Sequence, residues 1–145
     1  MVSVLVDTGM RLSELIKLRY EDVSFPNNLI SIWVNKGDRP RSIPMTSRVR
    51  MILELRQQTE RVRPFTLSVD EAERAWKWAR AEMGRMRDKE FVMHSLRHTC
   101  ASRLVNGNVD LYVVKELLGH SSIQITERYA HLNPTKLADA IEVLE

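Results

Sequence analysis

The chain has 145 residues, with 22 Lys or Arg against 19 Asp or Glu, so its formal net charge is only +3. Its length and its hydrophobic content of 43% are those of a globular domain with a substantial core. No run approaches the roughly 20 apolar residues of a membrane span, and no signal peptide is evident. The single cysteine, Cys100, excludes an internal disulfide and shares a predicted helix face with Leu96 and Leu104. We therefore expect a buried structural thiol and a reducing environment.

The N-terminal segment predicts a helix with one interruption. Apolar residues from Val2 to Leu18 follow helical spacing, and Gly9 breaks that spacing in the middle. We therefore expect a kinked junction at Gly9 that presents Arg11 just beyond it. Because this helical pattern begins without a capping residue, we also expect the chain to be a fragment of a longer protein.

The middle of the chain combines a small sheet with two helices. Alternating and β-branched residues predict strands at Leu29–Val34 and Ser42–Ile43, joined by a hairpin whose tip carries Lys36. One helix is expected from Ser47, and an amphipathic helix is expected over residues 69–83. The residues expected to face the core are Met51, Ile52 and Leu55 in the first helix and Val69, Ala72, Trp76, Ala79 and Met83 in the second.

The last third of the chain predicts a series of short helices. Their ranges are close to 96–105, 111–118 and 122–129. Gly107 and Gly119 mark the joints between them. Ser121 or Ser122 is expected to cap the third helix, and Asn133 is expected to cap a final one.

Basic residues concentrate between Lys36 and Arg63, where eight Lys or Arg accompany only three acids. In a chain that is close to neutral, such a stripe favours a polyanionic partner, although most charge runs are only solvated faces. Both interpretations stay open at this point. The residues of the stripe taken as candidate DNA contacts are Arg39, Arg41, Arg48 and Arg50.

The side chains best suited to chemistry lie between His94 and Tyr129. His94, Arg97 and His98 begin one predicted helix, and His120 follows a glycine joint. Such a set could converge on one phosphate, because arginines bind its oxygens, histidines transfer protons and a phenol can attack. The two histidines that flank Arg97 have the spacing of a helical metal pair, but no Glu is adjacent and the arginine favours an anion. No metal site is predicted.

Five segments in order resemble the motifs of the tyrosine recombinases, the phage integrase family. TGMRLSEL at 8–15 is similar to the first arginine box, and the run at 36–44 is similar to the β-hairpin lysine followed by a basic residue and a proline. HSLRH at 94–98 and LGH at 118–120 are similar to the second and third boxes, and Tyr129 occupies the place of the nucleophile. Each string alone is a weak signal, whereas five at family-like spacings are specific.

The resemblance assigns the chemical steps. Arg11 and Arg97 would neutralise the charge that builds up on the nonbridging phosphate oxygens. Tyr129 would attack the phosphorus, and Lys36 would protonate the leaving 5′ oxygen. A phenol has a pKa of about 10, well below that of an alkyl alcohol, so a phosphotyrosine keeps the bond energy for rejoining and no ATP is needed.

The remaining residues of the site receive supporting or less definite roles. His94 could act as a base or as a phosphate donor, and His120 could donate to a nonbridging oxygen. Glu14 is expected to buttress an arginine or another residue of the site. His98 is expected to support the fold from the second helical turn.

We therefore predict a mainly α fold with a small antiparallel β-sheet (α+β), similar to the catalytic domain of this family. Residues 1–145 would form that single domain, without the family's N-terminal core-binding domain and without the first helix that the resemblance implies before Val2. The resemblance implies cleavage and rejoining of DNA through a 3′-phosphotyrosyl intermediate, with no metal or other cofactor. The alternatives are a type IB topoisomerase-like relaxing enzyme and a non-catalytic DNA-binding module.

The implied partner is double-stranded DNA at an attachment or recombination site, with no membrane partner. We expect a tetramer of the full-length protein on DNA, and a monomer is the alternative for the isolated fragment. The expected location is the cytoplasm of a bacterial host, associated with the nucleoid.

Overall fold

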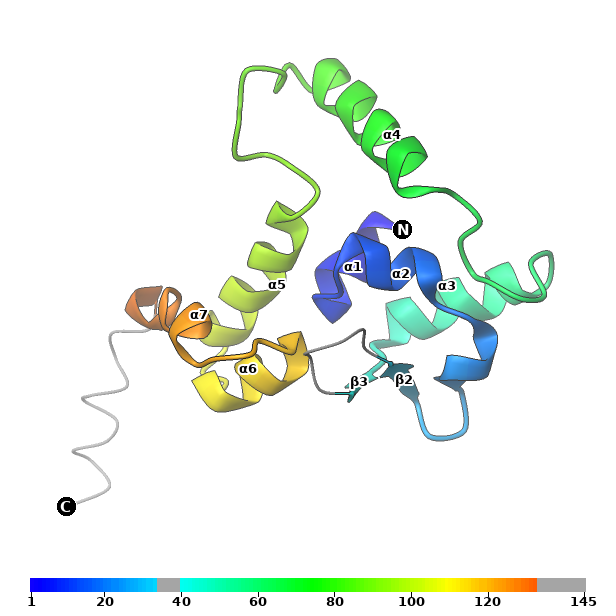
Figure 1. Ribbon diagram of the computed structural model, residues 1–145, viewed down its shortest axis with the longest axis horizontal. Coiled ribbons are helices and arrows are strands. Elements are labelled where there is room, and N and C mark those ends of the chain that lie inside the picture. Colours follow the sequence, from blue (N-terminus) through cyan, green and yellow to red (C-terminus); the bar gives the residue numbers. More distant parts are fainter. Residues whose placement is uncertain (34–39, 133–145) are drawn as a thin grey trace.

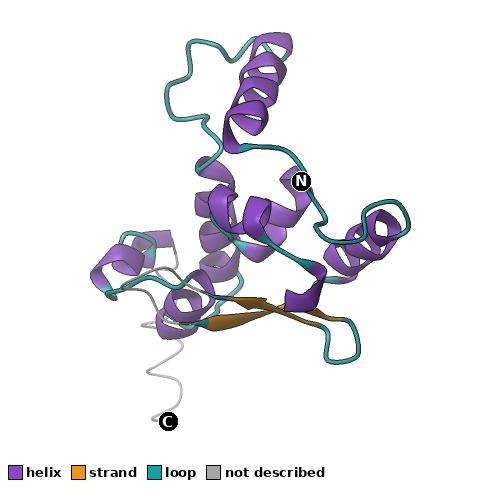
Figure 2. Cartoon of the chain, turned by 45° about the vertical axis from the view of Figure 1, so that its right-hand side comes forward, coloured by secondary structure: helices purple, strands orange, loops and turns teal. Residues whose placement is uncertain are grey.

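The computed structural model describes residues 1–33 and 40–132. The predicted hairpin tip with Lys36, the candidate DNA contact Arg39 and the predicted cap Asn133 lie outside these residues. Within them, the chain is mostly helical with a small three-stranded sheet, so the predicted fold class is confirmed (Figure 1). Figure 2 shows the strands along one side of the helices, with one long helix standing away from the rest.

The helices and strands follow one another along the chain, and the two longest described connections, 58–68 and 83–94, flank α4. The α-helices are α1 (Val2–Thr8), α2 (Leu12–Lys17), α3 (Ser47–Gln57), α4 (Val69–Glu82), α5 (Ser95–Asn106), α6 (Leu111–Leu118) and α7 (Gln124–Glu127). The strands are β1 (Val23–Ser24), β2 (Leu29–Ile32) and β3 (Arg41–Pro44), and the 3-10 helices are η1 (Tyr20–Asp22) and η2 (Ala130–Leu132).

The sheet is antiparallel in the order β1-β2-β3. Ile30 on the central strand pairs with Val23 on one side and Ile43 on the other. These three β-branched residues are buried, and their neighbours along the strands are more exposed, as expected for a sheet with one face on the core. β2 confirms the first predicted strand over Leu29–Ile32, and Val34 lies outside the described residues. β3 contains the second predicted strand, and β1 completes the sheet.

The predicted junction at Gly9 is confirmed, and it is unusually crowded. Gly9 ends α1 with φ 64°, a left-handed conformation that favours glycine. A Cβ atom at this position would lie 2.4 Å from Leu118 Cδ2 and 3.2 Å from Cys100 Sγ. The chain therefore turns where α1 meets α5 and α6. Cys100 is buried as predicted, and burial raises the pKa of its thiol to about 11.

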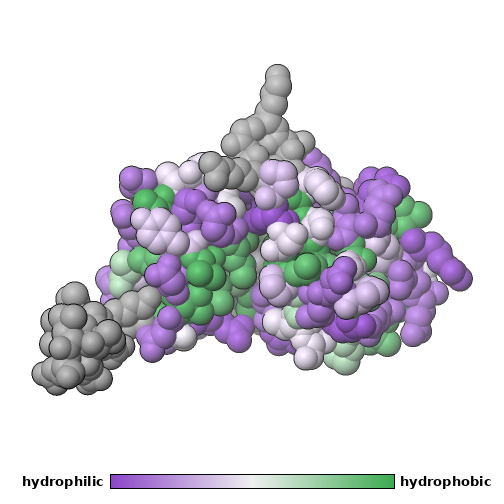
Figure 3. Space-filling model, turned by 90° about the horizontal axis from the view of Figure 1, so that it is seen from below, coloured by the Kyte–Doolittle hydropathy of each residue, from purple (hydrophilic) through white to green (hydrophobic). Residues whose placement is uncertain are grey.

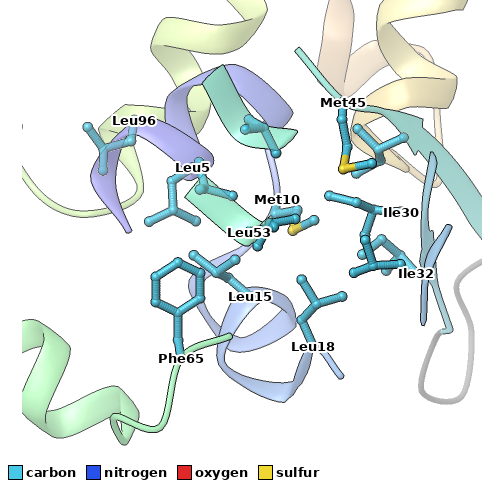
Figure 4. Close-up of a cluster of buried hydrophobic side chains, with 14 of the residues drawn as sticks. Leu5, Met10, Leu15, Leu18, Ile30, Ile32, Met45, Leu53, Phe65 and Leu96 are labelled. Carbon is cyan, nitrogen blue, oxygen red and sulfur yellow. The ribbon is translucent and has the colours of Figure 1, made fainter. Parts of the chain in front are cut away.

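Two apolar clusters make up the core. The larger one contains side chains of α1, α2, α3, α4 and the sheet. Figure 4 shows Leu5, Met10, Ile30 and Leu53 among the side chains that point into it. The smaller one lies between α5, α6 and the segment after α7, and it includes Tyr129. α1 and α5 pack together and link the two clusters.

Three local predictions were wrong. Met51 and Leu55 are 54% and 57% exposed, while Val49 and Leu53 on the same helix are fully buried. Both sets have helical spacing, so the sequence pattern did not decide which one packs against α1. In α4, Val69 and Met83 are exposed, and Ala72 and Trp76 alone are the buried residues of the expected stripe. Ile123, not a serine, precedes α7.

Candidate active site

Arg97 is buried between the ends of two helices. Its side chain is only 3% exposed, and it donates to Gly9 O at 2.6 Å and to Leu118 O at 2.7 Å. These carbonyls belong to the C-terminal ends of α1 and α6, where intrahelical partners run out and the helix dipole favours a cation. Burial, and next the charge of Arg11, lower the pKa of Arg97 to about 10, so it remains protonated at neutral pH. Both of these partners are neutral carbonyls, so neither neutralises the guanidinium, and Glu14 acts on its charge through space.

Glu14 bridges two further arginines, Arg11 and Arg41, through hydrogen bonds. It accepts from the backbone N–H of Arg11 at 2.7 Å and from Arg11 Nη1 at 3.1 Å. It also accepts from both terminal nitrogens of Arg41, at 3.0 and 2.8 Å. Burial alone would raise the pKa of Glu14, but the hydrogen bonds from Arg41 and Arg11 outweigh it and lower the pKa. The expected contact between Glu14 and an arginine is therefore present.

Arg41 faces the protein interior. Its side chain is 7% exposed, and its Nε donates to Leu117 O at 2.9 Å, near the end of α6. It also covers Gly119, where a Cβ atom would lie 2.9 Å from Arg41 Nη1. Gly119 has φ 69° and leads directly to His120, so Arg41 ties β3 to the turn that places this histidine. This geometry argues against the predicted DNA contact by Arg41.

A pocket of about 260 Å³ opens beside these arginines. Arg11, His94 and Arg97 line it, and Glu73 of α4 lies in its wall. The sequence did not predict that α4 would line the site, because a helical pattern does not indicate which element the helix will pack against. Two guanidinium groups at one pocket can hold a phosphate-sized anion.

The three histidines of the predicted site are in their neutral forms at pH 7. Burial, followed by the neighbouring arginines, lowers the pKa of His94 from 6.5 and that of His120 to about 4. Burial also lowers the pKa of His98. His120 Nδ1 lies 2.8 Å from the hydroxyl of Thr126, which is fully buried in α7. If that hydroxyl donates, the N–H of His120 is on Nε2 and can donate to an anion.

Tyr129 lies one residue after the C-cap of α7 and is 6% exposed. Its hydroxyl is in hydrogen-bonding contact with Nδ1 of His98. His94 stacks edge-on against His98 with 4.8 Å between ring centroids, so a line of rings runs from the pocket to the phenol. Burial raises the pKa of Tyr129, although Arg128 acts in the opposite direction. The prediction for His98 missed this contact, since spacing within one helix says nothing about a residue 31 positions away.

The other two described candidate DNA contacts, Arg48 and Arg50, have partners within the protein. Arg48 donates to both oxygens of Asp7, at 2.8 and 2.5 Å, and its side chain is 51% exposed. Arg50 donates to Phe25 O at 2.6 Å and pairs with Glu54. The face seen in Figure 3 mixes hydrophilic and hydrophobic residues.

Across residues 1–33 and 40–132, no group of three or more His, Cys, Asp or Glu is placed to hold a metal ion. In the same part of the chain, every helix is too short or too polar to cross a membrane.

Known proteins resemble this chain in sequence and in fold. The profile of the Phage integrase family matches residues 1–136. A tyrosine recombinase of Thermosipho africanus is 30% identical over 148 residues, covering 99% of this chain and 52% of that protein. The chain thus spans about half the length of this relative.

Two solved structures extend the comparison. The catalytic domain of bacteriophage HP1 integrase is 31% identical with a TM-score of 0.73, covering 97% of this chain and 78% of that one. The Tn1549 transposon integrase in complex with a circular intermediate DNA has a TM-score of 0.80 at 20% identity, covering 99% of this chain and 57% of that one, and it shows the fold alone. The five motifs, the arginine-lined pocket and the match over residues 1–136 lead to one conclusion: the chain belongs to the phage integrase family, the tyrosine recombinases.

Proposed function

We propose that this chain is the catalytic part of a site-specific recombinase that cleaves and rejoins double-stranded DNA through Tyr129. The observation that carries the proposal is the position of Arg97, which two neutral carbonyls hold at a pocket shared with Arg11 and His94. The ring of His98 connects His94, which lines this pocket, with the hydroxyl of Tyr129. Family membership and the coverage of about half of a full recombinase support a catalytic part that works within a longer protein.

In the proposed mechanism the scissile phosphate occupies the arginine-lined pocket. Arg11 and Arg97 neutralise the charge that builds up on the nonbridging oxygens. His120 donates from Nε2, because Thr126 engages its Nδ1. His94 provides a second neutral imidazole at the same pocket. Glu14 holds Arg11 in place through both its backbone and its side chain.

The chemical step exchanges one phosphate ester for another. Tyr129 Oη forms a bond to phosphorus, and the bond from phosphorus to the 5′ oxygen breaks. The 3′ end stays linked to the tyrosine, and the 5′ end leaves as a hydroxyl. Lys36 is proposed to supply the proton for that hydroxyl, which stays a prediction since this residue lies outside the described ones. Reversal of the same step by another 5′-hydroxyl rejoins the strands without ATP.

The partner and the setting belong to the same proposal. The DNA bound by the Tn1549 transposon integrase supports double-stranded DNA as the partner here. A tetramer of the full-length protein on a recombination site, and a place of action at the bacterial nucleoid, are the finer parts of the proposal. The proposal also assigns residues 1–145 to a single catalytic domain.

The experiment is covalent trapping on nicked duplexes whose sequence is randomised around the nick, in buffer containing EDTA. The unaltered chain and Tyr112→Phe should form a protein–DNA adduct, whereas Tyr129→Phe should bind DNA and form none. Tyr112 is a matched control because its side chain is 66% exposed. Undiminished adduct in Tyr129→Phe would refute the nucleophile, and strict dependence on added Mg²⁺ would refute the mechanism. Adducts without any sequence preference would favour a topoisomerase-like enzyme.

A further inference from the structure

We propose that His98 is the catalytic base that removes the proton from the Tyr129 phenol, a role for which His94 was the earlier candidate. This inference rests on the proposed function, in which Tyr129 is the nucleophile. His98 qualifies as a catalytic residue because its Nδ1 contacts the hydroxyl oxygen that would bond to phosphorus.

The geometry selects His98 among the neighbouring groups. The ring of His94 packs nearly perpendicular to the ring of His98, with 4.8 Å between their centroids. His94 therefore supports the ring of His98 on the side that faces the pocket. His120 directs its Nδ1 to Thr126. Arg97 and Arg128 also influence the phenol, but a guanidinium has no lone pair with which to accept a proton.

The protonation states suit the role. The groups that face His98 are His94 and Arg97 on its own helix, and Arg128 and Tyr129 from the segment packed against it. Burial, His94 and the two arginines lower the pKa of His98, so the ring is neutral at pH 7. Burial raises the pKa of Tyr129 from 10.0. Free phenolate would then amount to about 0.1% or less at neutral pH, so attack requires a partner that takes the proton.

His98 takes one proton from the phenol during cleavage and returns it during rejoining. As Oη bonds to phosphorus, the phenol O–H bond breaks and its proton moves to Nδ1 of His98. The ring already carries a proton on Nε2, since Nδ1 must be the acceptor, and becomes an imidazolium. The 5′ oxygen leaves with a proton from the acid proposed above. During rejoining, a 5′-hydroxyl attacks, the bond from phosphorus to Oη breaks, and His98 returns the proton to the phenol.

The activity test uses His98→Asn, because the Asn side-chain oxygen can accept the phenol hydrogen bond but cannot take the proton. His131→Asn is the matched control, an identical change at an exposed histidine. We expect His98→Asn to retain DNA affinity and thermal stability and to lose roughly 10²–10⁴-fold in the rate of adduct formation. For the unaltered chain the rate should rise with pH through an inflection below 6.5, the ordinary value for histidine, and His98→Asn should lose that inflection.

Three results separate the possibilities. Adduct in Tyr129→Phe would refute the proposed function itself. Loss of adduct in Tyr129→Phe together with an unchanged rate and pH profile in His98→Asn would overturn only the role of His98. A faster rate in His98→Asn would also overturn it, since His98 would then restrain the tyrosine.

A second measurement does not depend on activity. In nitrogen-15 NMR of the unaltered chain, His98 should be the Nε2–H tautomer, and its pKa should move in Tyr129→Phe but not in Tyr112→Phe. An Nδ1–H tautomer, or a pKa indifferent to Tyr129→Phe, would overturn the proposal even if His98→Asn proved unstable.

Discussion

Arg97 in the candidate active site and Arg48 in the basic stripe carry the same charge in very different surroundings. Arg97 is 3% exposed and donates to two neutral carbonyls, whereas the Arg48 side chain is 51% exposed and donates to the carboxylate of Asp7. The carboxylate neutralises Arg48, and the carbonyls leave the charge of Arg97 available to an anion. The number of basic residues in a segment therefore says less about phosphate binding than the partners that each one has.

Arg41 combines features of both regions. Like Arg97 it is buried and donates to a carbonyl at the end of α6, but like Arg48 it pairs with a carboxylate. Glu14 is shared between Arg41 and Arg11, so the three side chains together keep one net positive charge. Arg41 thus holds the residues of the site in position, and Arg97 and Arg11 supply the positive charge at the pocket.

The largest effect is expected from the same substitution in both regions. Arg97→Lys should lower the rate of adduct formation by about 10²–10³-fold, because an ammonium group cannot reproduce the planar fork that meets carbonyl and phosphate oxygens together. Arg48→Lys should change that rate little. Trapping rates on one nicked duplex provide the measurement, with DNA affinity as the control. Equal losses in the two variants would erase the contrast between the regions.

A modified substrate sharpens this prediction by separating charge neutralisation from proton donation. A bridging 5′-phosphorothiolate leaves as a thiolate and needs little protonation. Lys36→Ala should lose roughly 10²–10⁴-fold on ordinary DNA and recover most of it on the sulfur substrate. Arg97→Lys should stay impaired on both, since the nonbridging oxygens are unchanged. Lack of rescue in Lys36→Ala would remove this lysine as the acid.

The next largest effect concerns stability. Arg41→Met should lower the free energy of unfolding by roughly 3 kcal/mol, because removing one partner leaves the carboxylate of Glu14 buried with Arg11 as its remaining described partner. Arg19→Met is the control, since Arg19 and Glu21 are 47% and 66% exposed and such a pair contributes about 1 kcal/mol or less. Denaturant unfolding measures both. Similar losses would mean that Arg41 is no more structural than a surface arginine.

A smaller effect is expected in the salt dependence of DNA binding. Log affinity should fall linearly with log salt, and each lost phosphate contact should reduce the slope by about 0.9. Arg48→Ala and Arg50→Ala together should flatten that slope if the exposed stripe meets DNA, whereas Arg41→Met should leave it unchanged. A slope altered by Arg41→Met alone would restore the DNA contact originally predicted for that residue.

The smallest effect concerns pH and the Asp7 contact. The hydrogen bond from Arg48 is the main cause that lowers the folded-state pKa of Asp7 below 3.8. A lowered carboxyl pKa contributes stability that is present above the unfolded pKa and is lost as pH falls through the folded one. Unfolding between pH 5 and 2 should therefore show a steeper decline for the unaltered chain than for Asp7→Asn. Parallel curves would show that this ion pair adds nothing to folding.

The sequence by itself determined the features that depend on near neighbours. The breaks at Gly9 and Gly119 follow from a residue type that tolerates positive φ, and the contact of Glu14 with Arg11 follows from a separation of three residues. The strands followed from β-branched alternation, and the five motifs in order identified the family. These predictions succeeded because their physical causes act within one turn of helix or one strand.

Only the tertiary structure decided the contacts that give the site its properties. Arg97 reaches a carbonyl 88 residues away, Arg41 a carboxylate 27 residues away, and His98 a phenol 31 residues away. It also decided which apolar face of α3 is buried. Each of these depends on how helices with several acceptable faces pack together, and a periodic pattern gives the spacing of a face but not the element that covers it.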